Sequence, residues 1–164
     1  MKQLQRANVL THKLSRGFTA VEIVVALGIL VLIFGIGTQV FVTSRNAKQL
    51  ETYTDGVSSK LEEAKTNALA GKNGTNFGVK FSTTSYTYFN GSSYSSSATS
   101  NVPYNLLGKY NISNNIPGTD DAILFTRLTG IPSATGTIVI SDGGSPAKTA
   151  TVTVGVMGDV SVTK

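Results

Sequence analysis

The sequence predicts an α+β fold in which a long N-terminal helix packs on an antiparallel β-sheet. A continuous apolar run extends from Phe18 to Gly37. Beyond that run, apolar residues recur at steps of three and four as far as Ala70, which is the spacing of an amphipathic helix. The C-terminal part instead shows short β-patterned runs separated by turns rich in Gly, Pro and Asp. A helix of two different halves followed by a sheet accounts for all three observations.

The apolar run has the length of a transmembrane helix. A helix over residues 18–37 would span roughly 30 Å, the thickness of a bilayer's hydrocarbon core. No small-residue cleavage site of a secretory signal peptide follows it. The residues before it carry four basic side chains and no acidic one, so the positive-inside rule places the N-terminus in the cytoplasm. We expect a single-pass membrane protein with its N-terminus in the cytoplasm and its C-terminal domain outside.

Glu22 is the one acidic residue in the apolar run. An acidic side chain costs about 2.5–3.5 kcal/mol at the centre of a membrane helix and less near its end, so an ionisable residue there indicates a functional role. No Lys or Arg lies three or four residues away within the segment. A free amine at Phe18, four residues earlier, would be a partner if the chain were cleaved there. The alternative is an exposed glutamate near a membrane interface.

The stretch "RGFTAVEIVVALGIL" resembles the processing and assembly signature of type IV prepilins and type II secretion pseudopilins. The resemblance implies that a prepilin peptidase cleaves between Gly17 and Phe18, and that the new amine of Phe18 is N-methylated. It also implies that Glu22, at the fifth mature position, pairs with the Phe18 amine of an adjacent subunit and sets the assembly register. The fold implied is the type IV pilin fold, and the location implied is the bacterial inner membrane, followed by an extracytoplasmic filament after assembly.

We expect four segments: a cleaved basic leader (1–17), a transmembrane or filament-core helix (18–37), an amphipathic helix (38–70) and a β-rich globular domain (71–164). The amphipathic stripe consists of Leu50, Tyr53, Val57, Leu61, Ala64 and Ala68. The strand-like runs are NFGVKFS, YTYFNG, AILFTRLTG, GTIVIS, KTATVTVGV and GDVSVTK, and Val152, Val154 and Val156 should share one face. Residues 90–101 read as an exposed loop, and the closing series resembles the H-type (GspH/FimT) pseudopilins.

Composition argues against most catalytic and metal chemistry. The chain has no cysteine, and its only histidine, His12, lies in the leader. Beyond the leader the chain lacks the two commonest zinc ligands and an imidazole base. Asp120–Asp121 and Asp142 with its two following glycines suggest calcium loops, but calcium needs six to eight oxygens, so turn chemistry explains them better. We therefore expect a protein that is not an enzyme, with no metal and no cofactor.

The function predicted is that of a structural subunit, a minor pilin or pseudopilin, of a type IV pilus or a type II secretion pseudopilus. The partners expected are other pilin subunits, the prepilin peptidase, an inner-membrane assembly platform and membrane lipid before assembly. One alternative is a DNA-binding minor pilin of a DNA-uptake pilus. Nucleic acid is disfavoured because four of the 14 basic residues belong to the leader, leaving 10 against 9 acidic ones. The other alternative is a membrane-anchored binding domain that never polymerises.

Overall fold

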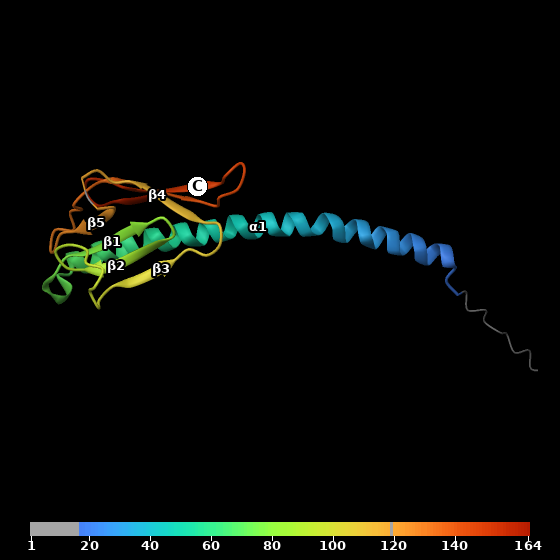
Figure 1. The fold of residues 1–164 in the computed structure, drawn as a ribbon, viewed down its shortest axis with the longest axis horizontal. Coiled ribbons are helices and arrows are strands. Elements are labelled where there is room, and N and C mark those ends of the chain that lie inside the picture. The colour runs from blue at the N-terminus through green and yellow to red at the C-terminus, as the bar shows by residue number, and fades with distance from the viewer. Residues whose placement is uncertain (1–16, 119) are drawn as a thin grey trace, which may run out of the picture. The chain divides into compact units, whose positions relative to one another are not determined.

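The computed structural model describes residues 17–118 and 120–164, without the side chains of residues 36–43. The predicted leader therefore lies outside the described residues except for Gly17. The chain divides into two compact units, residues 1–41 and 42–164. Helix α1 (Ala20–Leu69) contributes residues to both (Figure 1). Each unit is considered by itself below.

In the first unit, the described apolar side chains are exposed to solvent. Every described residue from 17 to 35 is exposed, including Val21 at 72% and Phe34 at 70%. Apolar residues occupy all sides of this stretch rather than one stripe, so no polar face is available to meet water. The stretch is well suited to burial against other apolar helices.

The predicted membrane span is wrong. Within residues 17–35 and 44–164, no helix is long and apolar enough to cross a membrane. The prediction of a transmembrane helix over 18–37, and the single-pass inner-membrane localisation drawn from it, are corrected accordingly.

The second unit holds eight strands in two antiparallel sheets of four strands each. One sheet has the order β3-β2-β1-β5 and the other the order β4-β6-β7-β8. The strand bounds are β1 (Phe77–Ser82), β2 (Ser85–Asn90), β3 (Val102–Asn105), β4 (Asn111–Asn115), β5 (Ala122–Phe125), β6 (Gly136–Ser141), β7 (Thr149–Val154) and β8 (Val160–Thr163).

One apolar core joins α1 to both sheets. Leu50, Val57, Leu61, Ala64 and Ala68 are buried, which confirms five of the six members of the predicted stripe. They belong to one cluster with residues of the first sheet and of the second, and Figure 1 shows the strands alongside this part of α1. The sixth predicted member, Tyr53, is only partly buried.

Thr54 also lies on the buried face of α1, although the predicted stripe did not include it. Its side chain is fully buried, and its hydroxyl donates to the carbonyl oxygen of Leu50 at 2.8 Å. A threonine can lie in an apolar core because this bond, one helical turn back, satisfies its hydroxyl.

The predicted fold class is also wrong. We expected one sheet beneath a long helix with an apolar transmembrane half; the unit of residues 42–164 is mostly β, with two sheets, and the described residues include no long apolar helix. The second sheet arises because β4 pairs with β6 rather than with β3. Nothing local to residues 111–115 specifies that partner, since strand pairing depends on residues far along the chain.

Individual strands agree better with the sequence. The strands β1 and β5 to β8 lie within the predicted runs, and β2 begins one residue before its run. Val152 and Val154 are buried on one face of β7 as predicted, but Val156 is 72% exposed. The reason is that β7 ends at Val154 and the chain turns, with the N–H of Gly158 donating to the carbonyl oxygen of Gly155. Residues 91–101 form no helix or strand, as expected.

Candidate functional site

Gly17 and Phe18 lie just outside the start of α1. The helix begins at Ala20, and residues 17–19 are neither helix nor strand. Phe18 is 80% exposed, which is among the highest values for a large apolar side chain in the described chain. The described residues 17–19 at this peptide bond are therefore exposed and outside regular secondary structure.

Thr19 caps the helix that follows. Its Oγ1 accepts a hydrogen bond from the backbone N–H of Glu22 at 3.2 Å, which is the geometry of an N-cap residue. The sequence Thr-Ala-Val-Glu matches the capping-box pattern, in which a Ser or Thr is followed three residues later by Glu. Our sequence analysis missed this signal, although the pattern is readable from residues 19–22 alone.

The backbone N–H of Glu22 is therefore hydrogen-bonded to Thr19, and its carboxylate takes no part in this cap. The carboxylate lies in the first helical turn, where the exposed N–H groups of the helix favour a negative charge. Among the described residues it has no ion-pair partner. Glu22 also borders a shallow hollow of about 260 Å³, whose lining residues are Phe18, Glu22, Ile23, Ala26, Leu27 and Leu30. A negative charge thus sits beside an open apolar surface.

The structure brings Gly17, Phe18 and Glu22 within six residues of one helix start, as their sequence spacing requires. What the arrangement can do is limited and clear: it can expose a scissile bond, present an amine after cleavage, and present a carboxylate one helical turn further on.

In the second unit, Glu51 on α1 takes part in a network of ion pairs. Lys164 and Lys48 donate to its two carboxylate oxygens at 2.8 and 2.7 Å, and Lys164 also lies 3.2 Å from Asp55. The hydrogen bond from Lys164, followed by that from Lys48, lowers the pKa of Glu51 to about 2. Lys164 directly follows β8, and Glu51 lies 113 positions earlier, so this network ties the end of β8 to the helix.

Asp142 organises the connection between β6 and β7. Its Oδ1 accepts the N–H groups of Gly144 at 3.0 Å and Lys148 at 2.9 Å, while Lys109 approaches Oδ2 at 3.6 Å. The two backbone hydrogen bonds lower the pKa of this buried carboxyl group. This is the turn role expected from the sequence. Asp121, the other acidic position considered there, has a left-handed backbone (φ 51°) and lies 3.9 Å from Lys80.

Metal-binding geometry does not occur in the part of the chain that the structure describes. No group of three or more His, Asp or Glu side chains there is placed to hold an ion. A hollow of about 340 Å³ lies between α1, the start of β7 and the residue that follows β8. Its lining is Ala47, Leu50, Glu51, Lys148, Thr149, Ala150 and Lys164.

Comparison with known proteins adds no assignment. No family model matches the chain, and neither a curated protein nor a solved structure is similar to it. The functional argument therefore depends on the residues and contacts described above.

Proposed function

We propose that this protein is a filament subunit of the type IV pilus or type II secretion pseudopilus class, processed between Gly17 and Phe18 before it assembles. The observation that carries the proposal is the uncovered apolar stretch of α1. The described residues 20–35 are all exposed, and Glu22 carries the only polar side chain among them. Such a surface is stable in an assembly that surrounds it with similar helices.

The helix start supports processing at this position. Removal of residues 1–17 would leave Phe18 as the first residue, with Thr19 still able to cap the helix through the N–H of Glu22. Cleavage therefore does not cost the helix its cap. The new amine would lie four residues from Glu22, and its N-methylation, which the resemblance implies, leaves it cationic.

Glu22 supports a register role for the assembled state. When apolar helices of several subunits pack together, an unpaired carboxylate among them is strongly unfavourable. The amine of Phe18 from an adjacent subunit is a group of opposite charge at a matching depth. Pairing would allow one axial offset between neighbours and penalise others. The partners proposed are other pilin subunits, a prepilin peptidase and an assembly platform.

The processing step is tested by mass spectrometry of the protein from its native host. The expected mature chain begins at Phe18 and carries one additional methyl group. An intact leader on protein recovered from filaments would refute the proposal.

The register role is tested by Glu22→Gln, with Thr19→Val as the matched control. Glutamine keeps the size and the backbone hydrogen bond of residue 22 but removes its charge. We expect Glu22→Gln to be cleaved normally and to be depleted from sheared filaments by about tenfold, which corresponds to about 1.4 kcal/mol. Thr19→Val removes only the helix cap and should assemble. If both variants assembled equally well, the carboxylate would have no register role; if both failed, the helix start rather than the charge would be responsible.

A further inference from the structure

A second apolar surface lies in the unit of residues 42–164, at the end where α1 stops. Five large apolar side chains there are exposed: Leu69 at 45%, Leu128 at 63%, Ile131 at 52%, Val156 at 72% and Met157 at 73%. We refer to these five residues as the apolar patch. Single exposed apolar residues are ordinary on a protein surface, but a contiguous group marks an interaction site.

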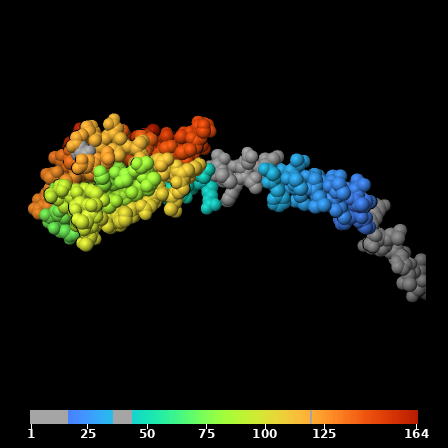
Figure 2. All heavy atoms as spheres, viewed as in Figure 1, coloured from blue at the N-terminus to red at the C-terminus, as the bar shows by residue number. Residues whose placement is uncertain are grey.

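Three segments distant in sequence meet to form the apolar patch. The N–H of Leu128 donates to the carbonyl oxygen of Ala68 at 2.8 Å, which places the β5–β6 connection against the end of α1. Lys65 donates to the carbonyl oxygen of Met157 at 3.0 Å, which places the β7–β8 turn against the same helix. In Figure 2 the green atoms that follow α1 and the orange atoms of the β5–β6 connection lie together at this end.

Close backbone contacts at two glycines hold the segments together. A Cβ on Gly130 would lie 2.8 Å from the Leu69 side chain, and one on Gly158 would lie 2.9 Å from the carbonyl oxygen of Gly130. Both glycines also have positive φ, of 64° and 71°. Only residues without a side chain permit this approach, so the three segments form one continuous surface rather than separate loops.

The backbone presents Leu128 outward under strain. Leu128 has φ 66°, a left-handed conformation that is unfavourable for a leucine, yet its side chain is exposed and fills no core position. An asparagine or glycine would adopt this conformation at lower cost. Residues held in such sparsely populated conformations cluster at binding sites.

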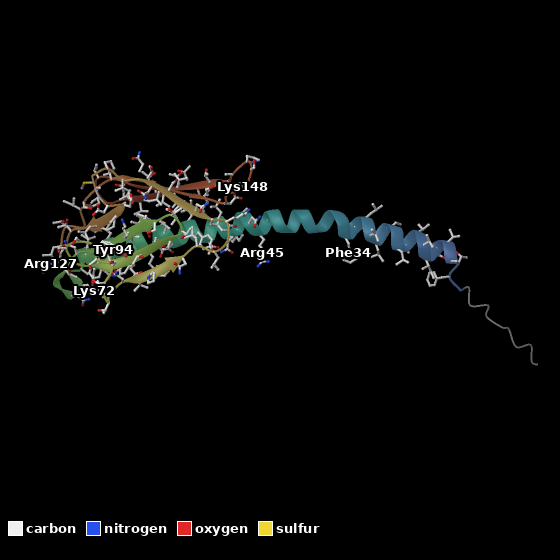
Figure 3. All side chains as sticks on the ribbon, viewed as in Figure 1. Phe34, Arg45, Lys72, Tyr94, Arg127 and Lys148 are labelled. Carbon is white, nitrogen blue, oxygen red and sulfur yellow. The ribbon has the colours of Figure 1, made fainter. Side chains whose placement is uncertain are left out.

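The charges around the apolar patch are mostly positive. Residues 65–76, 126–132 and 155–159 contain three cations, Lys65, Lys72 and Arg127, and one carboxylate, Asp159, for a net charge of 3 − 1 = +2. Figure 3 places Lys72 and Arg127 at this end. Lys72 has no ion-pair partner among the described residues.

We propose that the apolar patch binds a second, different protein whose contact surface has an apolar centre and an acidic rim. An apolar centre with a charged rim is the usual anatomy of a protein interface, and complementary charges select the partner. Another copy of this chain would bring the same cations against each other. A lipid surface would favour Trp or Tyr at the interface, whereas the apolar patch has only aliphatic and thioether side chains on anchored backbone. The inference does not depend on the filament proposal.

The test is site-specific photo-crosslinking of the full chain in its native host. A benzoylphenylalanine at position 157 should give one discrete adduct with another protein, identified by mass spectrometry of the linked peptide. The same probe at position 107 is the control, because Leu107 is also 73% exposed but lies in the β3–β4 connection. Leu128→Asn should reduce the adduct about tenfold, and Leu107→Asn should not. Asparagine suits the left-handed backbone, so Leu128→Asn should keep its melting temperature.

The rim charge provides the second readout. Lys72→Glu should reduce the adduct, and the reverse charge change at an acidic residue of the identified peptide should restore it. Lys148→Glu, which changes an exposed lysine at the edge of the hollow beside α1, is the matched control. An adduct no stronger at 157 than at 107, an adduct with the same chain, or one unaffected by Leu128→Asn would overturn the proposal. So would flotation of the purified full chain with vesicles of phosphatidylcholine and phosphatidylglycerol that Leu128→Asn abolishes, because the occupant would then be lipid.

Discussion

The Asp142 carboxylate should contribute to stability mainly as an acceptor of two backbone hydrogen bonds. Its Oδ1 accepts the N–H groups of Gly144 and Lys148, and its side chain is only 8% exposed. Asp142→Ala removes the acceptor from both N–H groups. Asp142→Asn keeps an oxygen in the same place and removes only the charge, which makes it the matched control.

The loss of stability expected for Asp142→Ala follows from the number of hydrogen bonds that Asp142 accepts and from their exposure to water. A hydrogen bond to a charged group contributes about 1.5–3 kcal/mol when well shielded. Gly144 is partly buried and Lys148 is exposed, so water can replace part of what Asp142→Ala removes. We expect Asp142→Ala to lower the free energy of unfolding by about 2–3 kcal/mol and Asp142→Asn by about 1 kcal/mol. For a domain of this size each kcal/mol corresponds to a fall in Tm of about 4 °C.

Urea denaturation of the three proteins at pH 7 and at pH 3 measures these differences. The folded-state pKa of Asp142 is lowered from its ordinary value of 3.8, so its contribution is complete above that value and decreases as the pH falls. The gap between wild type and Asp142→Ala should therefore narrow at pH 3. If Asp142→Asn were as unstable as Asp142→Ala, or if Asp142→Ala cost less than about 0.5 kcal/mol, the carboxylate would not organise this loop.

Two further predictions concern the core and the charge network. Gly78→Ala should destabilise the protein by more than about 2 kcal/mol in the same assay. The reason is that the added Cβ would lie 2.6 Å from the carbonyl oxygen of Ile123 and 2.9 Å from the Phe89 ring. An unchanged free energy of unfolding would show that β1 can shift within its sheet. Glu51→Gln should lower Tm at pH 7, because Lys164 and the neighbouring Lys48 stabilise the ionised carboxylate. The Tm of this variant should converge with that of wild type as the pH falls from about 4.5 to about 2. An equal difference in Tm at pH 7 and pH 2 would contradict a stabilisation by the ionised carboxylate.

Local features of the fold were readable from the sequence. The buried stripe from Leu50 to Ala68 follows from helical periodicity, and the alternation of β6 and β7 follows from the period of a strand, since both depend on residues a few positions apart. The cap formed by Thr19 is equally local. Gly17, Phe18 and Glu22 could be selected as a candidate site because their spacing along the chain is itself the signal.

Tertiary structure decided what depends on partners far along the chain. The pairing of β4 with β6 separated the strands into two sheets, and no pattern within residues 111–115 selects that partner. The same is true of Lys164 beside Glu51, and of the apolar patch, where Leu69, Leu128 and Met157 meet although each looks like an ordinary loop or helix-end residue in sequence. Periodicity reports which face of an element is apolar, whereas the choice of what covers that face is made by the whole chain.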